Sequence, residues 1–153
     1  MKPSTMLVIL GSTLVASLLG ALAPRRAAAD APSGRYTYPQ AGTVYDTQTK
    51  LTWEQTAEPG TFLWADAVNR CKQVTLAGGG WRLPSMGELQ TIVDETKSGP
   101  AIDTNAFTDG DSSVYWSSSS VAGSTSAAWY VVFIYGNAYS GDVNFSQRVR
   151  CVR

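Results

Sequence analysis

The spacing of apolar residues predicts a first amphipathic helix near the middle of the chain. Trp64, Ala67, Val68 and Cys71 follow the i, i+3, i+4, i+7 pattern of a single helix face. Because a helix buries its apolar face, Cys71 is expected to point towards the core.

Three glycines at 78–80 precede a short stretch that looks like a strand. Glycine allows the positive φ angles of a tight turn, and Trp81 and Leu83 then alternate as an inward-facing pair on either side of Arg82. Pro84 lacks a backbone N–H and is expected to end the strand.

A second helix is expected to begin directly after this proline. Ser85 and Glu88 have the spacing of a capping box, in which each side chain bonds the backbone N–H of the other residue. Leu89, Ile92 and Val93 would then form the apolar face of this helix.

Runs of alternating, β-branched and aromatic residues predict strands on both sides of the helices. Residues 43–46 and 51–54 are expected to form a hairpin around the turn 47–50. In the C-terminal third the candidate strands are 114–117, 129–135, 138–144 and 147–152, and the serine-rich residues 117–126 form an exposed loop. Two short helices with small antiparallel sheets constitute an α+β fold.

The N-terminal residues resemble a secretory signal peptide. Lys2 is followed by an apolar run at 6–23, and the alanines at 27–29 suit a cleavage site before Asp30. Residues 1–29 are therefore predicted to be a signal peptide and residues 30–41 a linker. Arg25 and Arg26 follow the apolar run, so an uncleaved anchor is the alternative.

Charge and histidine content exclude several classes of function. With nine basic and 12 acidic residues, residues 30–153 have a net charge of −3, which argues against nucleic acid as a partner and disfavours sulfated polysaccharides. The chain has no histidine, so a cysteine-protease dyad and a Cys/His zinc site are both excluded.

Export would expose both cysteines to an oxidising compartment, so Cys71 and Cys151 are expected to form a disulfide. The loop that it closes, about 80 residues, would stabilise the fold by roughly 4 to 5 kcal/mol in the chain-entropy model. A reactive thiol or a metal-binding pair is the competing interpretation.

Carboxylates provide two further hypotheses. The segment 103–111 is rich in oxygen ligands and raises the question of calcium, although its spacing does not match an EF-hand. A glycosidase needs only two suitably separated carboxylates, so sequence does not exclude one. The expected interpretation is solvated turns and helix caps, with no cofactor and no metal.

A candidate ligand surface lies in the stretch 135–144, which interleaves aromatic rings with amides, hydroxyls and a carboxylate. Such residues suit sugars, whose faces stack on rings, and also suit protein recognition. The predicted ligand-binding residues are Tyr135, Asn137, Tyr139, Asp142 and Asn144, with Tyr115 as a neighbour. Most of the five tryptophans are expected in the core, with Trp116 as the candidate for an exposed platform.

Several motifs together resemble the Lcl C-terminal domain family. They are Gly80-Trp81-Arg82-Leu83-Pro84-Ser85 with Glu88-Leu89-Gln90, Ala101-Ile102-Asp103, Tyr115-Trp116-Ser117-Ser118 and Val149-Arg150-Cys151-Val152-Arg153. The resemblance covers residues 42–153. The family takes its name from a bacterial collagen-like adhesin. The resemblance implies a C-type lectin-like fold, from the branch of that fold to which formylglycine-generating enzymes belong.

Two departures from the family pattern accompany the resemblance. Lys50 stands where the family usually has a turn glycine, and a left-handed residue there would cost about 1 kcal/mol. Leu63 replaces the threonine that usually caps the first helix. The activity of the enzyme branch depends on active-site cysteines and is not expected here.

These observations predict an exported, non-enzymatic bacterial module that recognises carbohydrate or protein at a cell surface. Its location would be secreted, periplasmic or on the cell surface, without stable membrane insertion once the signal is cleaved. The alternatives are a structural domain of the envelope without a small ligand and an enzyme related to the formylglycine-generating branch.

Overall fold

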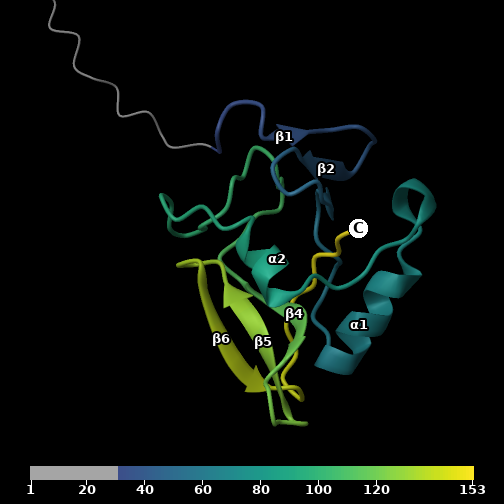
Figure 1. The fold of residues 1–153 in the computed structure, drawn as a ribbon, viewed down its shortest axis with the longest axis vertical. Coiled ribbons are helices and arrows are strands. Elements are labelled where there is room, and N and C mark those ends of the chain that lie inside the picture. Colours follow the sequence, from purple (N-terminus) through teal and green to yellow (C-terminus); the bar gives the residue numbers. More distant parts are fainter. Residues whose placement is uncertain (1–30) are drawn as a thin grey trace, which may run out of the picture.

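A computed structural model describes residues 31–153, so the predicted signal peptide lies outside the described residues. Figure 1 shows one three-stranded sheet near the top of the molecule and another near the bottom. The elements are β1 (Tyr36–Thr37), β2 (Thr43–Asp46), β3 (Thr52–Glu54), α1 (Trp64–Gln73), a 3₁₀ turn (Leu76–Gly78), α2 (Met86–Gln90), β4 (Val114–Ser120), β5 (Ala127–Val132) and β6 (Asn137–Asp142). Two helices, two antiparallel sheets and one disulfide confirm the predicted α+β class.

The upper sheet contains the predicted hairpin. β2 and β3 pair antiparallel around the turn 47–50, and Lys50 adopts a left-handed φ of 64° at the position expected to need it. The linker prediction for 30–41 is wrong in part, because β1 lies in that segment and pairs with β2. Arg35 next to β1 also forms an ion pair with Asp46 at 2.8 Å, which ties this segment to the sheet.

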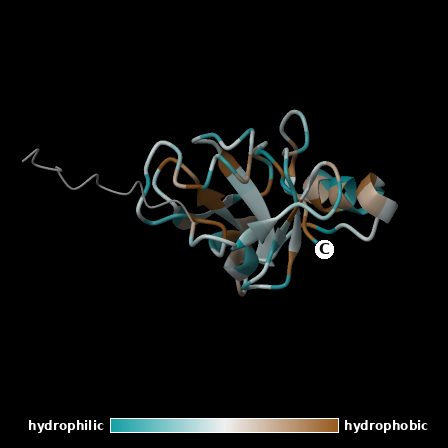
Figure 2. Ribbon diagram, turned by 90° about the horizontal axis from the view of Figure 1, so that it is seen from above, coloured by the Kyte–Doolittle hydropathy of each residue, from teal (hydrophilic) through white to brown (hydrophobic). Residues whose placement is uncertain are grey.

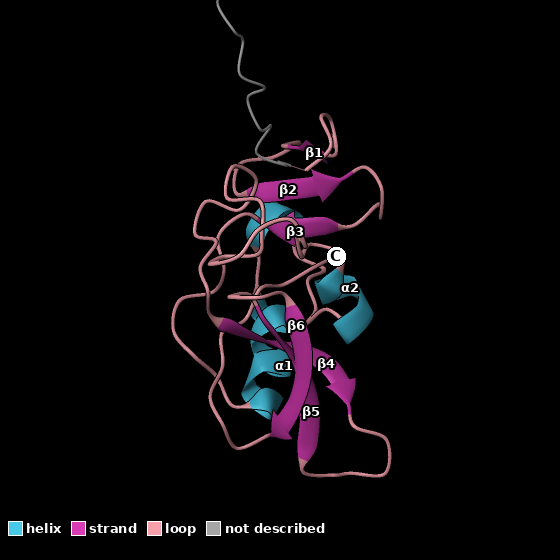
Figure 3. Cartoon of the chain, turned by 90° about the vertical axis from the view of Figure 1, so that its left-hand side faces the viewer, coloured by secondary structure: helices cyan, strands magenta, loops and turns pink. Residues whose placement is uncertain are grey.

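The lower sheet has the order β4-β5-β6, seen from its β6 side in Figure 3. The prediction that the serine-rich residues 117–126 form an exposed loop is wrong for residues 117–120, because these residues continue β4. Ser117 is buried. β5 ends at Val132, three residues earlier than predicted, because residues 133–136 turn the chain into β6.

Both predicted helices form, but the second is shorter than expected. α1 begins at Trp64 after Leu63, which provides no side-chain cap. Ser85 and Glu88 form the predicted capping box of α2, yet the helix ends at Gln90. Ile92 is still buried, because the turn that follows α2 folds it back into the core.

The two faces of the lower sheet are buried in two separate hydrophobic clusters. Tyr115 and Val131 pack with Leu89 of α2, whereas Trp116 and Ala128 pack with α1. Successive residues of a strand point to opposite faces, so the alternation of Tyr115 and Trp116 places the two helices on opposite sides of β4. In Figure 2 the outer loops are mostly hydrophilic or intermediate in colour.

The segment 147–153 connects these parts, although it is not the continuous strand that the sequence predicted. It makes isolated bridges instead: Gln147 with Phe62, Arg148 with Tyr115, and Val152 with both Trp53 and Arg82. Cys151 is joined to Cys71 of α1 by the predicted disulfide, with a Cα–Cα distance of 5.5 Å. Residues 151–153 run beside β3, whereas Gln147 and Arg148 pair with Phe62 and Tyr115, so the segment is divided between several elements and forms no single ladder.

Two charged residues are buried where this segment passes β3. Arg150 is 2% exposed, and its guanidinium donates to the backbone oxygens of Glu54 and Gln55 at 2.8 Å and to Asp109 at 2.6 Å. The pKa of Glu54 is raised to about 8, chiefly by burial; the N–H of Cys151 lowers it, and the neighbouring Glu58 acts in the same direction as burial. Glu54 is therefore protonated at neutral pH.

Removing the disulfide should destabilise the fold without changing its topology. In a Cys71→Ala, Cys151→Ala double variant the 80-residue loop is no longer closed, so the free energy of unfolding should fall by about 4 kcal/mol. Urea unfolding followed by tryptophan fluorescence measures this change. A loss below about 1 kcal/mol would contradict the structural role given to the bond.

The protonated Glu54 should make stability depend on pH. Its pKa is raised from 4.5 when unfolded to about 8 when folded, so the folded state holds the proton more tightly and stability should be lost as pH rises between these values. The free energy of unfolding should be lower at pH 8.5 than at pH 5 by more than about 1 kcal/mol.

Glu54→Gln should abolish that difference, because the amide keeps an acceptor for the N–H of Cys151 and cannot ionise. Glu95→Gln, which changes an exposed carboxyl, is the matched control and should keep the wild-type pH dependence. The same slope in wild type and Glu54→Gln would refute the assignment.

Candidate functional site

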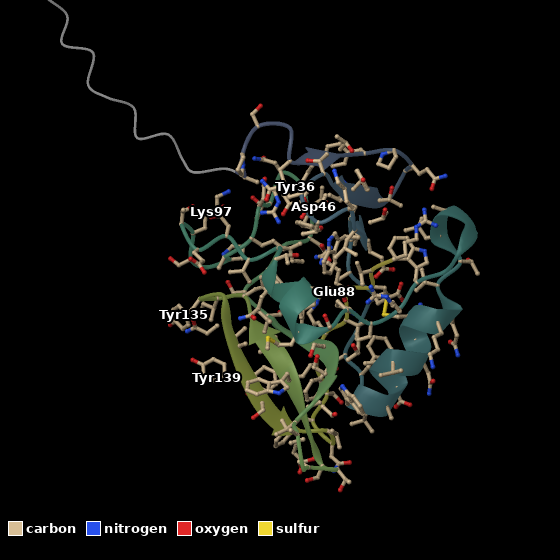
Figure 4. The ribbon with its side chains drawn as sticks, in the orientation of Figure 1. Tyr36, Asp46, Glu88, Lys97, Tyr135 and Tyr139 are labelled. Atoms are coloured by element: carbon tan, nitrogen blue, oxygen red, sulfur yellow. A yellow bond between two sulfur atoms is a disulfide. The ribbon has the colours of Figure 1, made fainter. Side chains whose placement is uncertain are left out.

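Exposed large apolar side chains concentrate in one part of the molecule. Of the six found among residues 31–153, four fall between positions 134 and 145: Ile134, Tyr135, Tyr139 and Phe145. Figure 4 shows Tyr135 and, below it, Tyr139 at the left-hand edge of the molecule; Tyr135 is on the turn before β6 and Tyr139 is on β6 itself. We call Tyr135, Asn137 and Tyr139 the tyrosine face.

An aromatic ladder connects this face with the core. Trp116, Tyr130 and Tyr139 are direct cross-strand partners on β4, β5 and β6. The ring centroids lie 5.7 Å apart for Trp116 and Tyr130, and 6.2 Å apart for Tyr130 and Tyr139. The ladder runs from the fully buried Trp116 to Tyr139, which is 48% exposed, so the exposed ring rests on a packed support.

The turn that presents Tyr135 is held by a close backbone approach. Gly136 has a φ of 78°, and a Cβ at this position would lie 2.4 Å from Cγ1 of Val93. Two backbone bonds join the turn to the loop after α2: the N–H of Gly99 donates to Ile134 and that of Ala101 donates to Phe133. Glycine is thus required here by both conformation and space.

Polar groups lie beside the exposed rings. The amide of Asn137 is 3.5 Å from the hydroxyl of Tyr139. The carboxylate of Asp142 accepts from both the backbone N–H and the side-chain amide of Asn144 at 2.8 Å, which fixes its orientation at the end of β6. Asn137, Asp142 and Asn144 are all exposed, as a surface that binds polar ligands requires.

Two aromatic residues named from the sequence lie in the core instead. Tyr115 is 2% exposed and its hydroxyl donates to Asp111, so it is not a surface neighbour of Tyr139. Trp116 is fully buried, and its indole N–H donates to the backbone oxygen of Phe62. The expectation of an exposed Trp116 is wrong because β4 continues past it and α1 covers that face.

Three residues of this region were not named from the sequence. Ile134 and Phe145 were not separated from core residues, since hydrophobicity alone suggests burial. Tyr130 supports Tyr139, and the alternation within β5 is the signal that could have found it, once the register with β6 was known.

A pocket of about 420 Å³ lies between β1 and the loop that follows α2. Its lining includes Arg35, Asp94, Glu95 and Asp103. The charge of Arg35 is matched by Asp46, so the remaining carboxylates make the pocket anionic. Such a lining favours a neutral or cationic group over an anion. Val93 lines this pocket and also lies against Gly136, in the turn that presents Tyr135.

The oxygen-rich loop 103–111 uses its carboxylates within the protein. Asp109 forms ion pairs with Arg150 at 2.6 Å and with Arg148 at 3.6 Å, and Asp111 pairs with Arg148 at 3.2 Å. Asp103 accepts from the N–H groups of Asn105 and Ala106. Across residues 31–153, no group of three or more potential metal-ligating side chains comes together.

The two cysteines and Glu88 also have structural roles. Cys71 and Cys151 share the disulfide, so neither is a free thiol. The salt bridge with Arg82 lowers the pKa of Glu88 to about 2, which suits its role in the helix cap. No helix within residues 31–153 is both long and apolar enough to span a bilayer.

The sequence was compared with known protein families and with curated proteins. Residues 42–153 match the model of the Lcl C-terminal domain. No curated protein is similar enough to register as a match. The matched region contains both helices, β2 to β6, the disulfide and the whole tyrosine face. The chain therefore belongs to the Lcl C-terminal domain family.

Proposed function

We propose that this chain is an exported, non-enzymatic module that binds neutral carbohydrate through the tyrosine face. The observation that carries the proposal is the clustering of exposed aromatic side chains at positions 134–145. A contiguous exposed apolar patch edged by polar groups is characteristic of a binding site.

The chemistry of the face suits a sugar ring. Tyr139 is supported from behind by Tyr130, so it offers a fixed ring on which the apolar face of a pyranose can stack. Asn137 lies two residues from Tyr139 on the same face of β6, with its amide 3.5 Å from the tyrosine hydroxyl, and can bond sugar hydroxyls. A support that is already packed reduces the entropy lost on binding.

Charge favours a neutral ligand over a sulfated one. The face contains no basic residue, and residues 30–153 have a net charge of −3, from nine basic and 12 acidic residues. A sulfated glycan would meet repulsion where it needs clustered lysine and arginine. We therefore expect binding to be weakened little by salt.

A binding role without catalysis is supported by the use of the reactive groups. The cysteines are in a disulfide, and Asp109 and Asp111 pair with arginines. The family's name suggests a role in attachment at a cell surface. The exposed tyrosine face is consistent with such a role.

A glycan array of the exported, oxidised chain tests the proposal. Wild type should bind neutral glycans selectively, and an Asn137→Ala, Tyr139→Ala double variant should lose at least about tenfold in affinity, because stacking and hydrogen bonding are removed together. Far-ultraviolet circular dichroism should remain unchanged, since both side chains are exposed.

Tyr38→Ala is the matched control, because Tyr38 is 54% exposed but follows β1 in the upper sheet. Its affinity should equal that of wild type. Absence of glycan binding by the folded protein would reject the carbohydrate ligand, and equal losses in Tyr38→Ala and the double variant would reject the site.

Binding should not require calcium. Arg148 and Arg150 already neutralise the carboxylates of Asp109 and Asp111. Adding EDTA should leave both the array signal and the melting temperature unchanged. A melting temperature that rises with added calcium would contradict this expectation.

A further inference from the structure

The lower sheet has one covered edge and one open edge. On β4, the N–H of Trp116 donates to Arg148, Arg148 donates back to Val114, and the N–H of Ser118 donates to Pro84. β6 is the opposite outer strand, and Figure 1 shows no element of the described chain beyond it. Other segments of the described chain therefore cover the β4 edge, whereas the β6 edge is left uncovered.

The register shows which backbone groups are open. The N–H of Val143 donates to Ser126 of the β5 side, and β6 pairs with β5 without a bulge from Asn137 to Asp142. Bonding direction alternates along a strand, so Ala138 and Ser140 direct their N–H and C=O groups outwards, as does the N–H of Asp142, while the C=O of Asp142 accepts from the N–H of Phe145.

This edge lacks the features that usually prevent strand addition. Such features are proline, a bulge, an inward-pointing charge or a lysine on the edge, and β6 reads Asn-Ala-Tyr-Ser-Gly-Asp. Its one charged residue, Asp142, stands at the end of the strand and is oriented by Asn144. A regular, weakly charged edge of this kind is a template for another strand.

We propose that β6 pairs antiparallel with β6 of a second copy of this chain, around a twofold axis at Ser140. The two sheets then form one continuous six-stranded sheet. Ser140 lies opposite its own copy, and Ala138 lies opposite Asp142 of the second copy. Ser140 and its copy exchange two backbone hydrogen bonds, and the N–H of Asp142 donates to the C=O of Ala138 of the second copy.

The side chains of β6 are complementary under this symmetry. Asp142 meets Ala138 of the second copy, so no carboxylate opposes another carboxylate. Tyr139 lies opposite Gly141 of the second copy, where it meets the Tyr130 ring that covers this glycine. The ring of Tyr130 lies directly over Gly141, since a Cβ at this position would be 2.9 Å from it.

The pairing also extends the aromatic ladder. Tyr139 and Tyr139 of the second copy become diagonal neighbours, about 7 to 8 Å apart, which is within reach of aromatic side chains. Trp116, Tyr130 and Tyr139 are thus continued by the same three residues in reverse order. The proposal concerns the strand edge and does not depend on the identity of any ligand.

Sedimentation velocity of the exported, oxidised chain tests the pairing. Between about 1 µM and about 1 mM the wild-type mass should rise from that of the monomer to twice that value. Ser140→Lys places two positive charges opposite each other at the axis and should weaken dimerisation at least about tenfold. Ser118→Lys, a matched exposed change on β4, should dimerise like wild type.

Hydrogen exchange provides a second measurement that does not require a variant. The amides of Ser140 and Asp142 should become more protected as concentration rises, whereas that of Tyr139, which already faces β5, should not change. A wild-type chain that remains monomeric throughout, or a Ser140→Lys variant that dimerises like Ser118→Lys, overturns the proposal.

Discussion

The guanidinium of Arg150 is 2% exposed, and a charge at that depth is stable only when its hydrogen-bonding groups are matched. Its hydrogen-bond partners come from two other segments: the backbone oxygens of Glu54 and Gln55 at the end of β3, and the carboxylate of Asp109 in the loop 103–111. The rings of Phe107 and Tyr115 lie beside it at 4.8 and 5.8 Å. Satisfying this one charge fixes how the upper sheet, the acidic loop and the lower sheet meet.

The lower sheet combines a structural and a recognition role along one row of residues. Trp116 on β4 lies in the hydrophobic cluster beside α1. Tyr130 on β5 packs against Trp116, and Tyr139 on β6 packs against Tyr130. Because the rings pack against one another, the position of the exposed ring is set by the buried one. The surface ring is therefore rigid without requiring a bound ligand to order it.

Sequence reasoning succeeded where the determining interactions are local. The face of α1, the Ser85 capping box and the 43–54 hairpin depend on residues a few positions apart, and all three are present. It failed where the partner is distant in the chain. Nothing near Trp116 indicates that α1 covers it, and nothing in the acidic loop indicates that Arg148 and Arg150 return to neutralise it. The exposure of Tyr135 and Tyr139 likewise depends on which edge of the sheet the later segment 147–153 occupies.

The position of that segment also affects when the protein can fold. Residues 147–153 are synthesised after every element that they join, yet they bridge Trp53, Phe62, Arg82 and Tyr115 and provide Cys151. The growing chain therefore cannot complete its core from the N-terminus onwards, as domains commonly do during synthesis. Before residues 147–153 are synthesised, both hydrophobic clusters lack members, Val152 in one and Val149 and Cys151 in the other, and the disulfide has no second sulfur.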